Sequence, residues 1–502
     1  MPTRTLLLTV AGAALLSTTA LADDSGRALT IYNENFAVVR ETVPMSLDKG
    51  VNHVTFNDIT YHVEPDSVIL RDPTGKHSLQ ILEQNYRADP VTQDLLLSVF
   101  EGQTIDFEVQ HGDQTQIIQG KIVRSGYVPH TQTIINYGYP YYQQQQTEAS
   151  DSQPIIEVDG KLRFSLPGTP LFPDLPNDSI LKPTLDWTLQ SDEAGPVNAE
   201  LAYITTGLSW KADYNVVAPE DGDDVDIVGW VTLDNQSGHT FDNAKIKLMA
   251  GDVNKVVNQS SMMMEDALSV GGTGGYAPPV SEKTFDDYHL YTLDRATTLR
   301  DRETKQVQFL TASHVHSKVI YVYDGADIDS QYSNWGYVNI RTQGDYGAKS
   351  NPKVWTMREI VNSEANHLGM PLPKGRMRFY RKDSDGQLEF IGENDIDHTP
   401  KDETLRVYTG NAFDLTGERR QVSFNCDYNK QMVDESFDIT LHNHKKTPVE
   451  IRVVEHLYRE ANWTISKNTA PFVKTDAHTI EFDVKVDPDQ DKKVDYSAHY
   501  WW

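Results

Sequence analysis

The sequence has almost no cysteine, because Cys426 is the single one among 502 residues. One thiol cannot form a disulfide within the chain, so the sequence predicts that burial and backbone pairing stabilise the fold. Cys426 alternates with Val422, Phe424 and Tyr428 along one face of an expected strand. This spacing favours a small apolar side chain in the core over a reactive thiol.

Long apolar runs are missing beyond the N-terminus. Leu6–Leu16 is short and apolar, follows Arg4, and precedes the small-residue site Ala20–Ala22. These features are typical of a secretory signal peptide over residues 1–22, and they predict a periplasmic or secreted protein. No later segment reaches the roughly 20 apolar residues of a spanning helix, so we expect no transmembrane helix after cleavage.

Positive charge is scarce as well. The chain has 45 lysine and arginine residues against 73 aspartate and glutamate residues, which gives a formal net charge of −28. This charge repels phosphate backbones, so the sequence predicts no nucleic-acid partner. It also disfavours an anionic membrane surface, whereas cations, basic proteins and neutral glycans stay open as ligands.

Helix signals are few, and two-residue alternation dominates the chain. Apolar residues alternate with polar ones in SFDITL, VEIRV, IEFDVKV and KIKL, which lie at 436–441, 449–453, 480–486 and 245–248. This alternation is typical of antiparallel strands with one buried face. The expected fold class is therefore all-β and multidomain, with a small β-barrel-like module, antiparallel β-sandwiches and few short helices.

One short helix is predicted over VTQDLLLSVF, with Asp89 as its cap, Pro90 at its first position and Gly102 after its end. The stretch Arg358–Asn366 is predicted to be helix or loop.

The chain is expected to divide into four parts after the signal peptide. Residues 27–88 form an N-terminal β domain, and residues 89–172 form the barrel-like module with a mobile loop at 128–151. Residues 173–345 form a β-sandwich with a mobile loop at 259–282, and residues 346–502 form a C-terminal β-sandwich. Both loops are polar or rich in glycine and proline, so they lack the apolar residues of a packed core. No repeat at a fixed period is visible in the sequence.

The stretch GLSWKADYNVV, Gly207–Val217, sets a tryptophan, a lysine and an aspartate on one expected strand. Trp210 shares the apolar face and is predicted to anchor the core, whereas Lys211 and Asp213 are predicted to face solvent. Ser209 lacks the second glycine of a nucleophile elbow, so a catalytic serine is not expected.

Two His-x-His pairs are the candidate metal ligands: His314 with His316, and His442 with His444. Residues two apart on a strand point to one side, about 7 Å apart, so one ion could bridge them. The pairs lack the further ligands that a closed site needs, and solvent-facing histidines are the favoured interpretation. We expect no cofactor and no catalytic residues.

A resemblance covers nearly the whole mature chain. It rests on LTIYNENFAVVRE, TPLFPDLPNDSILKPTLDWTLQS, YITTGLSWKADYNVV, VTLDNQSGHTFDNAKIKLMAGDVN and ITLHNHKKTPVEIRVVEHL, in this order. These stretches resemble an uncharacterised exported bacterial family related to the mucoidy inhibitor A protein, whose main domain is labelled only as a domain of unknown function. The resemblance implies a β-rich fold and no established catalytic residues, and the name of that relative hints at envelope biology.

The expected function is that of an exported, non-enzymatic binding or scaffolding protein of the bacterial cell envelope. Its partner is expected to be an envelope protein or a polysaccharide. One alternative is a glycan-acting or metal-dependent hydrolase, because acidic residues abound and glycosidases use two carboxylates about 5–9.5 Å apart. A second alternative is an outer-membrane β-barrel, because the sequence ends in the aromatic stretch VDYSAHYWW.

Overall fold

The computed structural model describes residues 26–87, 90–112, 114–127, 153–175, 179–251, 253, 255, 280–285, 288–328, 330–332 and 334–502. The predicted signal peptide, the predicted loop 128–151 and most of the predicted loop 259–282 lie outside these residues. The last three residues of that second loop belong to a strand, β16.

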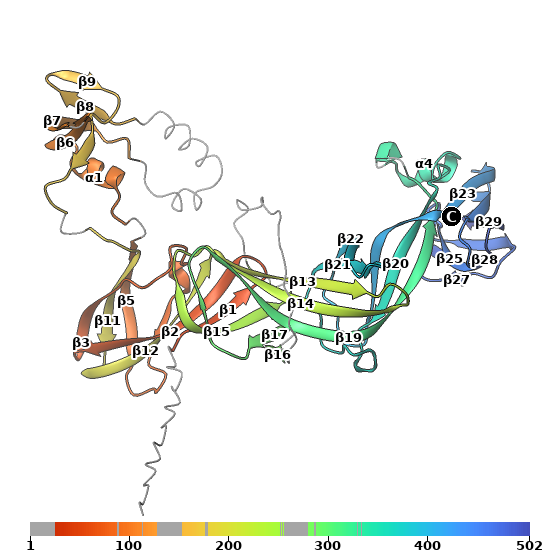
Figure 1. Cartoon of the computed structure of the whole chain (residues 1–502), viewed down its shortest axis with the longest axis horizontal. Coiled ribbons are helices and arrows are strands. Elements are labelled where there is room, and N and C mark those ends of the chain that lie inside the picture. The colour runs from red at the N-terminus through yellow and green to blue at the C-terminus, as the bar shows by residue number, and fades with distance from the viewer. Residues whose placement is uncertain are drawn as a thin grey trace, which may run out of the picture.

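Strands dominate the described residues and form four sheets, so the all-β class is confirmed (Figure 1). The sheets follow one another along the long axis, except that the sheet of the module at 89–172 stands apart from the others (Figure 1). Each helix in the described part of the chain is too short or too polar to span a lipid bilayer.

Two sheets lie at the N-terminal end. The larger has the order β16 (Val280–Phe285), β17 (Tyr288–Leu293), β15 (Phe241–Ala250), β1 (Ala28–Tyr32), β2 (Phe36–Leu47), β12 (Gly195–Thr206) and β4 (Ile69–Arg71), with β18 (Thr297–Leu299) on β15. The smaller has the order β3 (Gly50–Phe56), β11 (Thr184–Ser191) and β5 (Leu79–Arg87), with the 3₁₀ turn η1 (Pro65–Ser67) nearby in sequence. Strands from the segments 27–88 and 173–345 thus share both sheets, and the four predicted domains stay a prediction.

The largest sheet runs towards the C-terminus. Its order is β22 (Leu388–Ile396), β21 (Gly375–Lys382), β13 (Leu208–Ala218), β14 (Asp224–Asn235), β19 (Glu303–Asp324), β20 (Lys353–Val361), β23 (Thr404–Asp427), β24 (Met432–Asn443), β29 (Gln490–Trp501) and β26 (Trp463–Asn468). β25 (Val449–His456) pairs with β19 and with β28 (Thr479–Val486), which also carries β27 (Val473–Lys474). Three short helical segments are η2 (Ser330–Tyr332), α4 (Tyr337–Thr342) and η3 (Glu364–Asn366).

The sheets are mixed, not purely antiparallel. β1 runs parallel to β15, β13 to β21, and β19 to β25. Two-residue alternation reports only which face of a strand is buried, so it does not reveal the direction of the neighbouring strand.

The module at 89–172 is an open sheet. Its order is β10 (Thr169–Leu171), β6 (Thr104–His111), β7 (Gln114–Arg124), β8 (Ile155–Val158) and β9 (Lys161–Arg163). The predicted closure into a small barrel is wrong for the described residues, because the two short edge strands do not pair with each other. Helix α1 (Gln93–Val99) packs on this sheet through Leu97.

The predicted helix exists but begins later than expected. Thr92 caps it by accepting a hydrogen bond from the Leu95 amide over 3.2 Å, whereas the predicted cap Asp89 lies outside the described residues. The predicted helix or loop at Arg358–Asn366 is wrong in its first half, because Arg358–Val361 ends β20.

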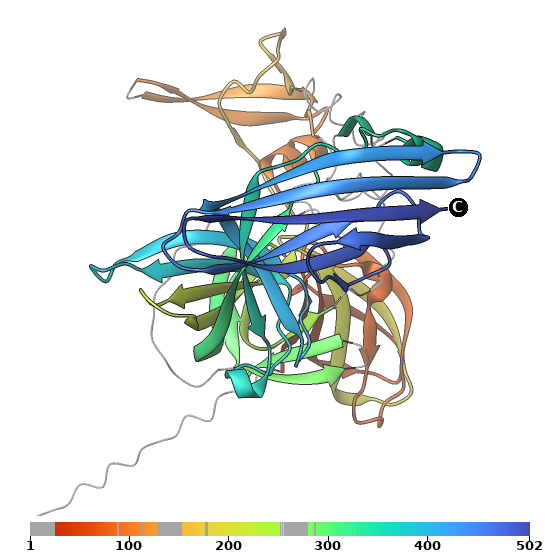
Figure 2. The same cartoon turned by 90° about the vertical axis from the view of Figure 1, so that its right-hand side faces the viewer.

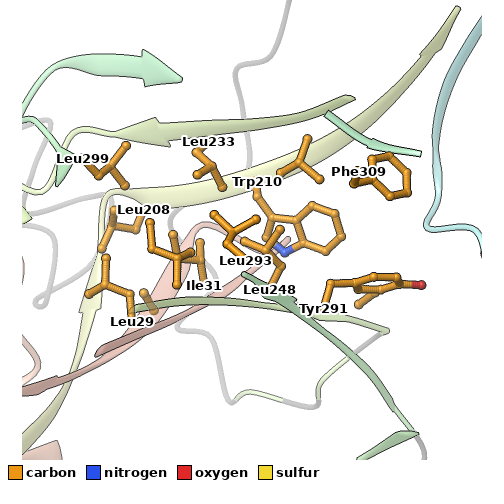
Figure 3. Close-up of a cluster of buried hydrophobic side chains, with 14 of the residues drawn as sticks. Leu29, Ile31, Leu208, Trp210, Leu233, Leu248, Tyr291, Leu293, Leu299 and Phe309 are labelled. Carbon is orange, nitrogen blue, oxygen red and sulfur yellow. The ribbon is translucent and has the colours of Figure 1, made fainter. Parts of the chain in front are cut away.

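Trp210 is a core residue, as predicted. Its side chain is 4% exposed and lies among Leu233, Leu248 and Tyr291 (Figure 3). Its indole Nε1 donates to the Met249 carbonyl over 3.2 Å, so the ring joins β13 to β15.

The prediction that Asp213 faces solvent is wrong. Lys211 is exposed, but Asp213 is only 6% exposed. It accepts from Thr232 Oγ1 over 3.2 Å and pairs with Arg378, whose Nη1 lies 3.4 Å away. β21 pairs with β13 and brings Arg378 next to this position, which the sequence alone does not reveal.

One strand arrangement occurs twice in the chain. β14 pairs with β13 and β19, and the next strand, β15, runs parallel to β1 and antiparallel to β17. Correspondingly, β24 pairs with β23 and β29, and β25 runs parallel to β19 and antiparallel to β28. The repeat therefore has a strand order in common but no fixed period in sequence.

Candidate functional site

The segment between β19 and β20, which we call the α4 lobe (330–332 and 334–347), rests on a buried arginine. Arg459 donates from Nη1 to the carbonyls of Ile340 and Gln343, each over 2.6 Å, and from Nη2 to that of Tyr346 over 2.9 Å. A second buried arginine, Arg419, donates to the Gly347 carbonyl over 2.6 Å. Two side chains from the largest sheet and the segment after β25 thus satisfy backbone groups of the lobe and fix its position.

Each arginine is paired with a buried glutamate. Arg419 Nε lies 2.9 Å from Glu455 Oε1, and these side chains are 3% and 0% exposed. Arg459 Nη2 lies 3.0 Å from Glu435 Oε2. Buried charges of this kind are tolerated only when they are paired and hydrogen-bonded.

Two tyrosines complete these ion pairs. Tyr496 donates to Glu455 over 2.5 Å, and Tyr500 donates to Glu435 over 2.8 Å. Burial, together with the neighbouring carboxylates, holds the pKa of both phenols well above their usual value. The hydroxyls therefore stay protonated and act as donors.

Aromatic rings connect the lobe to the end of β25. The Tyr332 centroid lies 4.6 Å from that of Trp335, and Tyr346 lies 6.1 Å from Trp335. Tyr458 lies 6.2 Å from Tyr346 and stacks on His456 with the ring centroids 5.2 Å apart. In Figure 2 the teal α4 segment lies beside the end of the blue β23–β24 hairpin.

A polar row lies beside these rings, across the ends of three neighbouring strands. His456 Nε2 is 3.1 Å from Asp324 Oδ2, and His456 Nδ1 is 3.3 Å from Thr479 Oγ1. The register of β25 with β28 places His456 directly opposite Thr479. The hydrogen bond to Asp324 raises the pKa of His456.

The order of acid, imidazole and hydroxyl resembles a hydrolytic triad, but Thr479 has a second hydrogen-bond partner. The His478 amide and the Thr479 hydroxyl both bond to Asp476 and lower the pKa of that carboxylate. In the arrangement in which the Thr479 proton points at Asp476, His456 donates from both ring nitrogens and is a cation. An imidazolium has no lone pair with which to activate a hydroxyl.

We call this group of residues the distal site. Its members are rings and hydrogen-bonding groups on rigid strands and on the α4 lobe: Asp324, Tyr332, Trp335, Tyr346, His456, Tyr458 and Thr479. Tyr458 is 38% exposed, and the other rings are partly exposed. The arrangement offers aromatic faces next to a polar row, which suits binding.

A second cluster of titratable groups lies near the N-terminal end. Glu41 is 5% exposed, receives Nε of Arg27 at 3.3 Å, and accepts from the Tyr203 hydroxyl at 3.5 Å. Arg27 also pairs with Asp58, whose Oδ1 lies 3.6 Å from Nδ1 of His239. Burial raises the pKa of Glu41 to about 7. We call these five residues the Glu41 cluster.

The predicted metal ligands lie elsewhere and remain apart from both groups. His314 has a φ of 57° at a register shift between β14 and β19, so His314 and His316 do not follow regular strand alternation. His316 Nδ1 lies 3.2 Å from Asp224. Within the described residues, no cluster of three or more His, Cys, Asp or Glu side chains is arranged to hold a metal ion.

His442 and His444 do lie on one face, as predicted. Their rings are nearly parallel, with centroids 6.4 Å apart, and His442 Nδ1 lies 2.7 Å from Asp491. The metal interpretation of these residues stays a prediction.

Most of the chain matches one known protein family. Residues 199–502 match the family described as Domain of unknown function (DUF4139), and the chain belongs to this family. No curated protein and no solved structure is significantly similar to the chain.

Proposed function

We propose that this DUF4139-family chain is an exported binding or scaffolding protein of the bacterial cell envelope that acts through the distal site. Export is supported by the N-terminal signal pattern at residues 1–22. A relationship to the mucoidy inhibitor A protein is part of the same proposal and rests on the sequence resemblance. An envelope protein or polysaccharide is the partner that such a location favours.

The observation that carries this proposal is the rigid support of the α4 lobe. Two buried arginines, each paired with a buried glutamate, hold a surface segment that carries aromatic rings, although replacing such charges with apolar groups often costs no stability. Preorganised aromatic residues bind with little loss of conformational entropy. A binding surface explains why buried charged residues position this lobe.

The hydrolase alternative has less support. A glycosidase needs two carboxylates on either side of an open substrate groove. Glu41 and Asp58 share Arg27, but the Glu41 side chain is only 5% exposed, so the two carboxylates do not both face an open groove. We therefore keep the non-enzymatic proposal.

Sedimentation with isolated cell envelopes tests the proposal. The mature chain should co-sediment, and the double variant Trp335→Ala/Tyr458→Ala should lose most of this binding. Phe413→Ala, which removes a ring that is 96% exposed outside the distal site, is the matched control and should bind normally. Equal binding by all three proteins would refute a role for the distal site.

A further inference from the structure

We infer that the distal site binds a neutral polysaccharide, with sugar rings packed on Tyr458 and Trp335 and their hydroxyls bonded to the Asp324–His456 row. This inference rests on the proposed binding function and names the ligand class of the same site.

The charges at the site argue for a neutral ligand. Asp324 is paired with His456 over 3.1 Å, and Arg341 of the lobe is paired with Glu460. Asp345 accepts a hydrogen bond from the Tyr332 hydroxyl over 3.2 Å. A cationic ligand would compete with these existing partners, and an anionic polymer would meet a chain of net charge −28.

The rings supply the apolar half of sugar recognition. A pyranose has a face of C–H groups that packs on an aromatic ring, while its hydroxyls need hydrogen-bonding groups at the ring edge. The Tyr458 ring is supported by His456, with an interplanar angle of 23°. Burial raises the pKa of Tyr458, so its hydroxyl remains a neutral donor beside the stacking face.

The polar row supplies the hydrogen-bonding half. Asp324 uses Oδ2 for His456, whereas its Oδ1 has no hydrogen-bond partner. A carboxylate oxygen without a donor is costly unless a donor arrives, and a sugar hydroxyl is such a donor. Oδ1 is buried, so a small rotation of Asp324 must accompany ligand binding.

Strand addition by a peptide fits this end of the sheet less well. A peptide that extends a sheet needs a free strand edge. At this end β28 is already flanked by β25 and β27, whose Val473 and Lys474 pair with Glu481 and Ile480. The α4 lobe also has several of its carbonyls bonded to Arg459, which leaves them less available to a peptide.

Chemical treatment of the envelopes separates the ligand classes. Periodate cleaves vicinal diols of sugars, and protease digests protein. We expect periodate-treated envelopes to lose binding of the mature chain at least about tenfold, and protease-treated envelopes to keep it. Binding should change less than about twofold between 0.05 and 0.5 M salt, because a neutral ligand forms no ion pairs.

Direct binding to purified polymers completes the test. Neutral hexose polymers should retard the chain in affinity electrophoresis, and acidic polymers such as alginate should not. Tyr458→Ala and Trp335→Ala should each weaken retardation about tenfold, and Asp324→Asn should weaken it several-fold, while Phe413→Ala leaves it unchanged. Circular dichroism of each variant confirms folding.

The outcomes separate this inference from the proposed function. Loss of binding with protease but not with periodate, still dependent on the distal site, overturns the polysaccharide and leaves a protein-binding function standing. Absence of any envelope binding overturns both. Preference for acidic polymers, with strong salt dependence, also overturns the inference.

Discussion

The guanidinium of Arg459 faces the carboxylate of Glu435 in the C-terminal core, with Nη2 and Oε2 3.0 Å apart and the side chains 2% and 6% exposed. The same guanidinium donates to carbonyls of the α4 lobe, so one residue both balances a buried charge and positions a surface segment. The Cζ atom of Arg459 also lies 4.6 Å from the centroid of the Phe424 ring, so this ring packs on the flat face of the guanidinium.

Arg459→Ala should destabilise the protein by about 3–5 kcal/mol, because Glu435 would remain as a buried charge without its ion-pair partner. Hydrogen exchange should also accelerate in the α4 lobe, since its carbonyls lose their donor. Arg420→Ala is the control, because Arg420 is 68% exposed and its pair with Asp438 contributes less than about 1 kcal/mol. Urea unfolding compares the two variants, and equal losses would contradict this account.

The alternation in the sequence correctly identifies the buried faces of the strands. Phe437, Ile439 and Leu441 of β24 are all buried, as are Ile480 and Phe482 of β28. Alternation succeeds here because each strand has one face against the core, and this requirement is local to the strand.

The buried charges also leave a signal in the sequence, although they belong to no catalytic motif. Glu435 stands in phase with Val433 and Phe437, and Glu455 stands in phase with Ile451 and Val453. Glu41 likewise falls between Val39 and Val43. A charged residue in an apolar phase predicts a buried ion pair or a functional group.

The partners of these charges were not predictable from local pattern. Arg419 and Glu455 are paired although they lie 36 residues apart in the sequence. Asp324 and His456 are hydrogen-bonded although they lie 132 residues apart. Alternation does not say which strands become neighbours, or whether they run parallel. The distal site depends on the strand order, so the local sequence pattern does not predict it.

Two asparagines mark equivalent positions in the repeated strand arrangement, and both should be essential for stability. Asn235 ends β14 and donates to the carbonyls of His239, Leu299 and Arg300, while Asn443 ends β24 and donates to those of Thr447, Val486 and Asp487. Both side chains are at most 1% exposed.

Asn235→Ala and Asn443→Ala should each cost more than about 2 kcal/mol, because each leaves one buried and two partly buried hydrogen bonds unmade. Asn85→Ala, at an exposed position of β5, should cost less than about 0.5 kcal/mol. Thermal unfolding followed by calorimetry measures all three. A small effect at Asn443 alone would indicate that the two positions are not equivalent.

Trp210→Ala should be among the most destabilising single substitutions, at about 3–5 kcal/mol, since it opens a cavity between β13 and β15. Trp501→Ala removes a ring that is 44% exposed and should cost less than about 1 kcal/mol. Urea unfolding should be followed by far-ultraviolet circular dichroism, because tryptophan fluorescence changes with the substitution itself. Similar costs for the two variants would contradict the role of Trp210 as a core anchor.

The Glu41 cluster predicts a specific dependence of stability on pH. Burial raises the pKa of Glu41 from 4.5 to about 7 in the folded protein, so the folded state binds this proton more tightly than the unfolded state. The stabilisation is fully present below about pH 4.5 and is lost as pH rises through about 7, on the order of 3 kcal/mol in total. Glu41→Gln should remove this contribution, so the difference in unfolding free energy between variant and wild type should change across this window.

The neighbours of Glu41 give two variants with opposite expected effects. Asp58 raises the pKa of Glu41 by repulsion, so Asp58→Asn should move the midpoint of the pH-dependent loss to lower pH. Arg27 lowers that pKa, so Arg27→Gln should move the midpoint to higher pH. Burial lowers the pKa of His239, although the neighbouring Asp58 acts in the opposite direction. Shifts in the same direction for both variants would show that Glu41 is not the titrating group, since a single carboxylate must respond oppositely to the loss of an anion and of a cation.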